Sequence, residues 1–529
     1  MRPFLTLVIA LLALLASGCA SLPPISAVKR QPSMGILASK DTPLGRIAAD
    51  STPSKELTGF RLMPIGSFAL DTRLALARRA AVSLDVQYYQ IHDDDTGRYL
   101  LRTLRDAAAR GVRVRLLMDD LYTEGEDEML LGLAAHPNVE IRLFNPFPGG
   151  RDGGVLSRFT ASLADFSRVN HRMHNKLFIA DGAMAVAGGR NIGNEYFMRD
   201  GTHNFVDLDA FITGALVPQL QFLFDYYWNS PYVYPLHAVV PPSADAATLQ
   251  ARFDERTGPR TTAPPPPPPA NDVLGYGPVS GELDDGRVGL IWADAEAYAD
   301  PPDKIAAMAK GAKRERYLDE EAVRVNVLAE LRAAKQEVVL TSPYLIPGKK
   351  GLEVMQGLRE RGVKVRLLTN SLAATDEPLV HIGYSHYRKQ MLKMGVELYE
   401  LSPTRVKRSW KLGMFGESRG RLHAKTAVID RRHVFIGSMN FDPRSEIHNT
   451  EMGLIIDSPQ LAREMLRLMD LDKLQASYRV RLGKDGETLQ WLSLDDEQGE
   501  MIQEDEPDAG WLQQLWLNII SPLAPEELL

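Results

Sequence analysis

Two long segments of the chain share one alternation of apolar and polar positions. Residues 100–117, "LLRTLRDAAARGVRVRLL", place apolar residues at helical spacing that ends near Gly111, and an apolar strand pattern follows. Residues 352–368, "LEVMQGLRERGVKVRLL", repeat this order. Apolar runs at 82–91 and 336–346 predict one strand upstream of each helix. Alternating strands and helices predict layered α/β domains whose sheets are covered by helices.

The second copy of this pattern stays in register with the first. Gly111 and Gly362, which follow the two predicted helices, are 251 residues apart, and His174 and His423 are 249 residues apart. A nearly constant offset over so long a stretch indicates an internal duplication. The sequence therefore predicts two similar domains.

A proline-rich segment separates the two copies. It contains six consecutive prolines, Pro264–Pro269, which favour an extended spacer and exclude a helix or a central strand. The sequence therefore predicts a first domain over 57–258, a linker over 259–286 and a second domain over 287–529.

The first residues predict export. "MRPFLTLVIALLALLASGCASLPP" has one arginine, a continuous apolar run and small residues before Cys19, a pattern typical of a secretory signal peptide, here over 1–18. Cys19 is the sole cysteine of the sequence, which excludes an internal disulfide. The stretch also resembles a bacterial lipoprotein signal, which implies acylation of Cys19. A cysteine inside a discarded signal peptide is the alternative. Residues 19–56, rich in Ser, Pro and Thr, predict a tether.

The composition is that of an ordinary folded protein. Apolar residues make up 44% and charged residues 24% of the 529 positions, which fits neither a disordered chain nor a multi-span membrane protein. The length suffices for two or three domains. The formal net charge of -7 disfavours a protein that holds nucleic acid through bulk positive charge.

Each half contains one histidine motif. "HNKLFIADGAMAVAGGRN" begins at His174, and "HAKTAVIDRRHVFIGSMN" begins at His423. In each motif, the histidine and the lysine two positions later share one face of a predicted strand. The aspartate of each motif lies past the strand end, an odd number of positions after the lysine. We therefore expect Asp181 and Asp430 to face elsewhere, into the contact between the halves.

The residues that follow each strand suit a phosphate. Glycines let backbone N–H groups approach a ligand, and Asn191, Ser438 and Asn440 can donate hydrogen bonds to phosphate oxygens. Together with Lys176 and Lys425 they suit a phosphodiester and phosphoryl transfer. A metal site is the alternative for a cluster of His and Asp. Because a lysine between the ligands repels a cation, we predict no metal and no cofactor.

The doubled H-x-K-x(4)-D motif resembles that of the phospholipase D superfamily, and the similarity runs from about residue 57 to the C-terminus. The stretches "VQYYQIHDDDTG", "SLAATDEPLVHIGYSHYRKQML" and "IGSMNFDPRSEIHNTEMG" resemble the C-type branch of bacterial cardiolipin synthases, as does Gly189 in place of a serine. The resemblance implies an α/β fold of two similar domains, each a β-sheet covered by helices. A pseudo-twofold axis would relate them, with the active site at their interface.

The resemblance also implies a role for each motif residue. His174 is implied to be the nucleophile, forming a phosphatidyl-histidine, and His423 the general acid and then the base. The reverse assignment stays open. Asp207 and Glu451, each one hairpin and one strand after the histidine of its own half, are implied to orient the histidines, and Asp209 competes with Asp207. The residues implied to be catalytic are His174, Lys176, Asp181, His423, Lys425 and Asp430.

The implied function is a phosphatidyltransferase that makes cardiolipin from phosphatidylglycerol, with phosphatidylethanolamine as a phosphatidyl donor. The alternatives are a phospholipase D that releases phosphatidic acid, a nuclease, and a non-catalytic envelope lipoprotein. Two intact motifs argue against the last. We expect phospholipid substrates, membrane attachment through the lipid anchor, and no nucleic acid. We also expect a protein that faces the periplasm, and Ala20 favours the outer membrane by the sorting habit of such lipoproteins.

Three further stretches have two interpretations each. "HDDDTG", at 92–97, favours a helix cap over a metal site. The basic stretch 405–421 suits an anionic headgroup site and a solvated loop equally. The apolar helical face of 511–520 favours packing on the protein core over insertion into a membrane interface.

Overall fold

The computed structural model describes residues 22–151, 153–162, 165–305, 322–413, 415–495 and 499–510. Cys19, the predicted signal peptide and the predicted C-terminal helix lie outside these residues. Among the residues described, no helix is both long enough and apolar enough to cross a bilayer.

The first half is a mixed sheet built around three parallel strands. From the outer edge its order is β9 (Val233–Pro235), β4 (Val139–Phe144), β3 (Arg113–Asp119), β2 (Ser83–Tyr88), β5 (Leu177–Ala180), β6 (Met184–Gly188), β8 (Asp209–Gly214) and β1 (Thr58–Met63). β2, β3 and β4 run parallel because α4 (Asp95–Ala109) and α5 (Asp127–Ala134) connect them as crossovers. The strand, helix and strand predicted over 82–117 are therefore confirmed.

The second half repeats this order outward from the centre. Its strands are β10 (Ile291–Ala299), β17 (Met452–Asp457), β16 (His433–Gly437), β15 (Thr426–Ile429), β11 (Glu337–Thr341), β12 (Lys364–Asn370), β13 (Glu397–Leu401), β18 (Ser477–Leu482), β19 (Leu489–Asp495) and β20 (Gly499–Gln503). β11, β12 and β13 are parallel, like β2, β3 and β4. The predicted duplication is confirmed.

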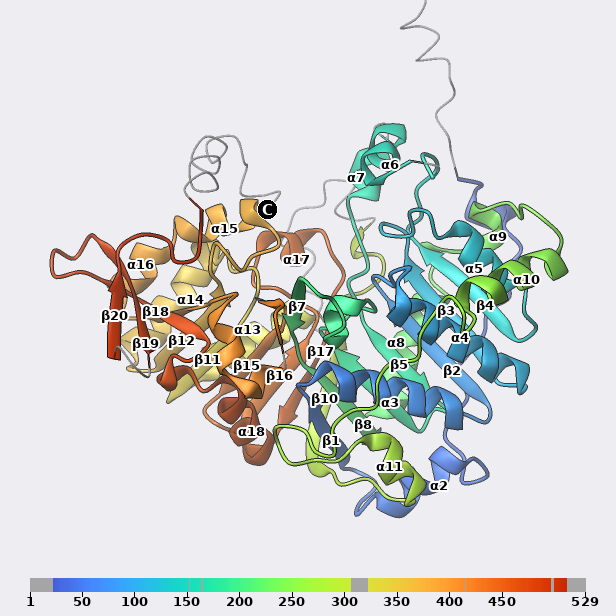
Figure 1. Cartoon of the computed structure of the whole chain (residues 1–529), viewed down its shortest axis with the longest axis horizontal. Coiled ribbons are helices and arrows are strands. Elements are labelled where there is room, and N and C mark those ends of the chain that lie inside the picture. The colour runs from blue at the N-terminus through green and yellow to red at the C-terminus, as the bar shows by residue number, and fades with distance from the viewer. Residues whose placement is uncertain are drawn as a thin grey trace, which may run out of the picture.

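β1 and β10 join the two halves. They pair antiparallel, with Gly59 opposite Trp292, and β10 also pairs with β17. The strands named so far therefore form one 18-stranded sheet. Its order is symmetric about this central pair out to β9 and β18, as a pseudo-twofold relation requires, and β19 and β20 extend the second half. Figure 1 shows the first half in blue and green beside the second half in yellow to red.

Helices cover both faces of the sheet. On one face, which we call the outer face, the first half has α3 (Gly66–Arg79), α4, α5, α10 (Ala246–Thr257) and α11 (Val279–Asp284). The second half has α13 (Val323–Ala333), α14 (Gly348–Glu360), α15 (Pro378–Ser385) and α16 (Arg388–Lys393) on this face. On the other face α8 (Val217–Trp228) and α18 (Pro459–Met469) contribute to one apolar cluster that contains Phe60, Trp228, Leu454 and Met465. Because this cluster includes residues of both halves, the halves share a core.

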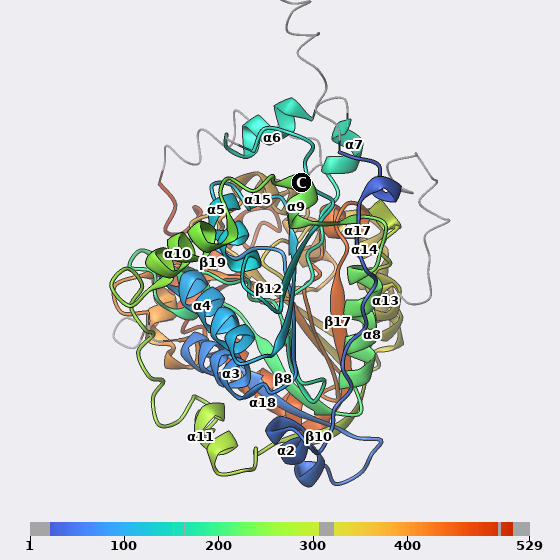
Figure 2. The ribbon, with the colours of Figure 1, turned by 90° about the vertical axis from the view of Figure 1, so that its right-hand side faces the viewer.

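The segment predicted as a tether is packed on the first half in its described part. Pro43–Ser51 forms α2, in which Leu44 is fully buried. The Arg30 guanidinium donates to the carbonyl oxygen of Ser230 at 2.6 Å, and the N–H of Gly35 donates to Asp225 at 2.7 Å. Figure 2 shows this dark blue segment running alongside α8. The tether prediction is therefore wrong for residues 22–56, because polar and backbone contacts, which leave no periodic pattern, hold them in place.

The prolines of the linker belong to neither a helix nor a strand, as predicted, but α11 follows within the linker. Val279 and Leu283 of α11 are buried against the outer core of the first half. The linker is therefore part of the first half's outer layer as well as a spacer.

Candidate active site

The two motif histidines lie at corresponding strand ends. His174 precedes β5, whose first residue, Leu177, pairs with Gln87 near the carboxyl end of β2. His423 precedes β15, whose first residue pairs with Thr341 at the carboxyl end of β11. Both histidines therefore lie at the carboxyl edge of the parallel strands, where side chains from several elements converge.

Backbone hydrogen bonds between the halves hold each histidine in place. The N–H of His174 donates to the carbonyl oxygen of Thr450 at 2.8 Å, and that of His423 donates to Val206 at 2.8 Å. The second contact continues a two-stranded parallel ribbon between β7 (His203–Val206) and β14 (Arg419–Leu422), one strand from each half. The residue after Thr450 is Glu451, and the residue after Val206 is Asp207. The main chain therefore brings each histidine to the acid of the opposite half.

The side chains complete this crossed arrangement. Nδ1 of His423 lies 2.6 Å from Oδ2 of Asp207, and Nδ1 of His174 lies 2.9 Å from Oε2 of Glu451. Nδ1 of His174 also lies 3.0 Å from the carbonyl oxygen of Ser438, which can only accept. Nδ1 must therefore carry the proton, which leaves the lone pair on Nε2. The sequence identified both acids, but each contacts the histidine of the other half and not that of its own.

The two histidine–acid pairs differ in charge. Burial raises the pKa of Glu451 to about 7. Burial also opposes ionisation of Asp207, but the charges of His423 and Lys425 hold its pKa at about 2. Burial lowers the pKa of His423 to about 4 and that of His174 well below its ordinary value. At neutral pH, His423 therefore faces a full negative charge and His174 faces a partly protonated acid.

Both motif lysines are buried beside the histidines. Nζ of Lys176 donates to the carbonyl oxygen of His174 at 2.6 Å, and Nζ of Lys425 donates to that of His423 at 2.5 Å. Burial lowers the pKa of Lys425 to about 8 and that of Lys176 well below its ordinary value. An anion that enters this site would raise the pKa of both lysines and favour their charged form.

The motif asparagines have unused hydrogen-bonding capacity. The side-chain oxygens of Asn191 and Asn440 are buried without a hydrogen-bond partner among the described residues. The Asn191 amide nitrogen donates to the Tyr196 hydroxyl at 3.0 Å. Phosphate binding by these two asparagines stays a prediction.

The Ser438 hydroxyl does not make the contact predicted for it, which was with a phosphate. Its hydroxyl donates to Oε2 of Glu451 and accepts from the N–H of Met452 at 3.0 Å, so it points at the acid and not at a ligand. Gly189 takes the equivalent place in the first half, where an added Cβ would lie 2.1 Å from Oδ1 of Asp207. The Asp207 carboxylate itself fills this space, which explains why the first motif has glycine.

The motif aspartates lie away from the histidines. The Asp181 carboxylate accepts backbone hydrogen bonds from Ala81, Val82 and Ser83 at 2.9–3.1 Å, at the start of β2. Asp430 does the same for 335–337 at the start of β11. Each aspartate therefore braces a neighbouring strand of its own half. It faces neither the site nor the contact between halves, and the inclusion of Asp181 and Asp430 among the catalytic residues is corrected.

Aromatic residues that the sequence did not single out form the walls of the site. The Tyr89 ring meets His174 edge-on at 5.0 Å, and the Tyr196 ring meets His423 edge-on at 5.2 Å. The Tyr344 hydroxyl donates to Asp376 at 2.8 Å. Tyr89 directly follows β2, and Tyr344 lies in the corresponding loop after β11.

Two other stretches can now be interpreted. Asp94 caps α4 by accepting from the N–H of Gly97 at 2.9 Å, which confirms the helix cap predicted in "HDDDTG". In the basic stretch, Arg408 pairs with Asp495 and Lys411 with Asp470, both at 2.6 Å. These charges are therefore satisfied within the second half, which weakens the interpretation of the stretch as a headgroup site.

Comparison with known proteins agrees with this geometry. A family model described as "Cardiolipin synthase, PLD-like domain" matches residues 74–228 and 327–472, more than half of the chain. The chain belongs to the cardiolipin synthase family of the phospholipase D superfamily. The predicted resemblance and fold class are thereby confirmed.

Members of this family are similar over most of the chain. Cardiolipin synthase C of Escherichia coli K12 is 38% identical over 465 residues, which cover 87% of this chain and 94% of that protein. Cardiolipin synthase A of Pseudomonas fluorescens is 25% identical over 415 residues, 78% of this chain and 68% of that protein. The crystal structure of phosphatidylserine synthase from Haemophilus influenzae Rd KW20 superposes with a TM-score of 0.53 at 13% identity, covering 92% of this chain and all of that one. The last likeness shows the fold alone.

Proposed function

We propose that this chain is a phosphatidyltransferase that makes cardiolipin, moving a phosphatidyl group onto phosphatidylglycerol through a phosphohistidine intermediate. One observation carries this proposal: two buried imidazoles, one from each half, each face the acid of the opposite half through Nδ1. This leaves Nε2 of both rings for chemistry on one phosphodiester. Membership of the cardiolipin synthase family supports a phospholipid substrate.

The charges favour His174 as the nucleophile. A nucleophilic imidazole must be neutral, and burial keeps the pKa of His174 well below its ordinary value while the pKa of Glu451 is raised to about 7. A general acid must hold a proton, and the ionised Asp207 stabilises an imidazolium at His423. Because a bound phosphodiester adds negative charge, it raises the pKa of His423 when substrate is present.

The reaction then has two balanced steps. In the first, Nε2 of His174 attacks phosphorus, the phosphorus–oxygen bond to the donor headgroup breaks, and His423 gives its proton to the departing alcohol. In the second, His423 takes the proton from a hydroxyl of phosphatidylglycerol. The resulting oxygen attacks phosphorus, and the phosphorus–nitrogen bond to His174 breaks. The two lysines and the two asparagines would stabilise the negative charge on the phosphoryl oxygens.

We also propose that the protein is an envelope lipoprotein. Cys19 would carry the lipid, and the folded part would face the periplasm from the outer membrane. Labelled palmitate should enter the parent chain and not a Cys19→Ser variant, and density fractionation should recover the parent with outer-membrane markers. Recovery with the inner membrane would contradict the sorting proposal.

The lipid profile of cells that lack cardiolipin tests the catalytic proposal. These cells should gain cardiolipin when they express the parent chain and should gain none with His174→Ala or His423→Ala. His237→Ala is the matched control, because His237 is an exposed histidine away from the motifs and should leave cardiolipin unchanged. Headgroup-labelled phosphatidylethanolamine, which should release ethanolamine, tests the donor.

Other outcomes would point to other functions. Phosphatidic acid that accumulates in place of cardiolipin would make the protein a phospholipase D, in which water resolves the intermediate. Unchanged lipids together with cleavage of DNA would make it a nuclease. Cardiolipin formed equally by both histidine variants would exclude the proposed mechanism.

A further inference from the structure

A segment with two short helices lies beside the first motif histidine, His174. Between β4 and His174 the chain forms α6 (Val155–Ala161) and α7 (Phe166–Val169). Beneath them lies a separate small apolar cluster of Leu121, Phe147 and Val169, against which Phe159 and Tyr89 pack. Tyr89 is also the ring that meets His174 edge-on. Tyr89 therefore connects the helical segment to His174.

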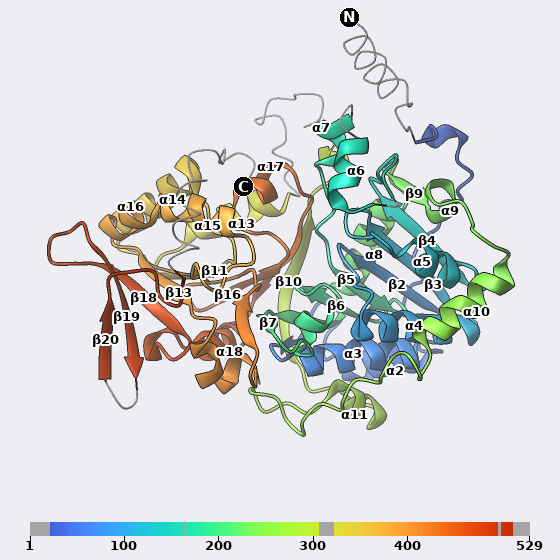
Figure 3. The same cartoon turned by 45° about the horizontal axis from the view of Figure 1, so that its top comes forward.

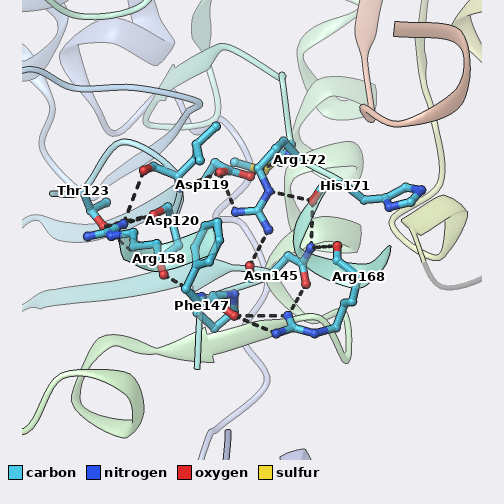
Figure 4. Close-up of polar contacts among 12 residues, drawn as sticks. Asp119, Asp120, Thr123, Asn145, Phe147, Arg158, Arg168, His171 and Arg172 are labelled. Carbon is cyan, nitrogen blue, oxygen red and sulfur yellow. Dashed lines mark hydrogen bonds and ion pairs between the residues drawn. The ribbon is translucent and has the colours of Figure 1, made fainter. Parts of the chain in front are cut away.

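Buried polar contacts hold this helical segment against the ends of β3 and β4. Arg172 pairs with Asp119 at 3.1 Å and donates to the carbonyl oxygen of Asn145 at 2.8 Å. Arg158 of α6 is fully buried and donates to the Thr123 hydroxyl at 3.0 Å. Figure 4 shows these side chains linking the segment before His174 to the loop after β3. A segment anchored in this way presents its outer side chains in a fixed arrangement.

The exposed side chains of this segment and of the loop after β3 include three large apolar ones. Leu156 is 78% exposed and Phe166 is 44% exposed, and the neighbouring Tyr122 is 36% exposed. We call these three residues the apolar rim. The Phe166 ring contacts Phe159 at 5.9 Å, and the Tyr122 ring contacts Tyr89 at 5.3 Å. The rim is therefore continuous with the small cluster and, through Tyr89, with His174.

The arginines described beside the rim, Arg151 and Arg168, are already paired. Arg151 contacts Asp120 at 2.7 Å and Asp127 at 2.6 Å, and Arg168 contacts Asp165 at 2.6 Å. These arginines are not available to anionic headgroups. A surface that exposes apolar side chains beside neutralised charges fits the interfacial region of a bilayer better than a charged partner.

We propose that the apolar rim contacts the phospholipid bilayer and that lipid substrate passes over it to His174. Figure 3 shows α6 and α7 projecting from the end of the molecule that also carries α17 (Pro443–Ile447). The proposal deepens the proposed function, since it supplies a route for a lipid. Its test is separate, because vesicle binding is measured without turnover.

A second exposed apolar patch provides the matched control. Phe222 and Tyr226 of α8 are 60% and 44% exposed, and their rings stack on each other at 6.4 Å. Their helix also holds the N-terminal segment, since Asp225 accepts from the N–H of Gly35. The ring contacts of the two motif histidines in the described chain are with Tyr89, Tyr196 and Phe205. The two patches expose similar apolar side chains, but the α8 patch lacks the connection to the site.

Vesicle sedimentation tests the proposal. The full chain is used with Cys19→Ser, so that no acyl group on that residue contributes, with vesicles of phosphatidylethanolamine and phosphatidylglycerol. The double variant Leu156→Ser/Phe166→Ser should bind about tenfold more weakly, because the removed apolar side chains no longer enter the interface. Phe222→Ser/Tyr226→Ser should bind like the parent. Equal binding by both double variants, loss with the α8 variant alone, or binding abolished by high salt would overturn the proposal.

A tryptophan probe keeps the test valid if the double variant does not fold. Leu156→Trp replaces one exposed apolar side chain by another, and bromine-labelled lipid should quench its added fluorescence. Absence of that quenching would overturn the proposal. His174→Ala should abolish cardiolipin synthesis and keep vesicle binding, so failure of the catalytic proposal and failure of the bilayer contact give different results.

Discussion

Oδ2 of Asp207 in the first half lies 2.6 Å from Nδ1 of His423 in the second half. The equivalent contact joins Glu451 of the second half to His174 of the first. Because each half supplies one histidine and the acid for the other histidine, neither half alone holds a complete histidine–acid pair. The active site therefore exists only when the halves are assembled.

Asp207→Asn should reduce kcat more than Glu451→Gln. Asp207 is ionised and stabilises a charged His423, so we expect its amide variant to lose about 10³-fold in kcat. Glu451 is partly protonated at neutral pH, because burial raises its pKa to about 7, and its amide variant should lose about tenfold. Steady-state kinetics on mixed micelles measures both. Equal losses would contradict the unequal charges of the two pairs.

The same raised pKa makes stability depend on pH. Between its ordinary pKa of 4.5 and the folded value of about 7, Glu451 holds a proton in the folded chain and has lost it in the unfolded chain. The folded state therefore binds more protons, and stability falls as the pH rises through this window. Relative to Glu451→Gln, the parent should lose about 1 kcal/mol of unfolding free energy between about pH 6 and about pH 8. Urea denaturation at several pH values measures this difference, and a flat difference would show that Glu451 is ionised throughout.

Gly189→Ser should damage the site although the second motif has serine at this place. The new Cβ would lie 2.1 Å from Oδ1 of Asp207, so the carboxylate must move away from His423. We expect a loss of about 10²-fold in kcat. Ser438→Gly is the matched control, since it removes one hydrogen bond to Glu451 and should cost about fivefold in kcat. A fully active Gly189→Ser variant would show that this half tolerates a displaced acid.

Asp181→Ala should lower stability and leave catalysis intact. Its carboxylate accepts hydrogen bonds from three consecutive backbone N–H groups, and their loss should cost about 3 kcal/mol of unfolding free energy. Asp430→Ala should cost about 1 kcal/mol, because that aspartate is partly exposed and water can replace it. Denaturation and active-site titration separate the two effects. A drop in kcat per titrated site would return Asp181 to the catalytic residues.

Sequence patterns predicted the elements that local rules control. The helix and strand around Gly111 and their copy around Gly362 were confirmed, since amphipathic periodicity and a glycine stop are local signals. The central pairing of β1 with β10 could not be predicted, because strand pairing over more than 200 residues leaves no local trace. The segment around Arg30 was mistaken for a tether for a related reason: side-chain bonds to carbonyl oxygens hold it, and these have no sequence period.

The histidines and acids of the candidate site were predicted, but which acid pairs with which histidine was not. Motif spacing identified both histidines, and the family resemblance pointed to both acids. A duplicated chain permits pairing within or between halves, and the backbone contact of His423 with Val206 selects pairing between halves. Motif membership also placed Asp181 among the catalytic residues, although its carboxylate serves the start of β2. A residue that recurs in both motifs can therefore have a structural role and no catalytic one.

The continuous sheet through β1 and β10 has a consequence for how two large lipids are handled. Main-chain hydrogen bonds and a shared core cross the boundary between the halves, so the halves cannot open and close as a hinged clamp without breaking them. We therefore expect the separation of His174 and His423 to change little through the catalytic cycle. In the proposed mechanism the donor lipid must then enter first and release its headgroup alcohol, and its phosphatidyl group stays on His174 until the acceptor lipid arrives. Such an enzyme should show double-displacement kinetics, with parallel double-reciprocal lines for donor and acceptor.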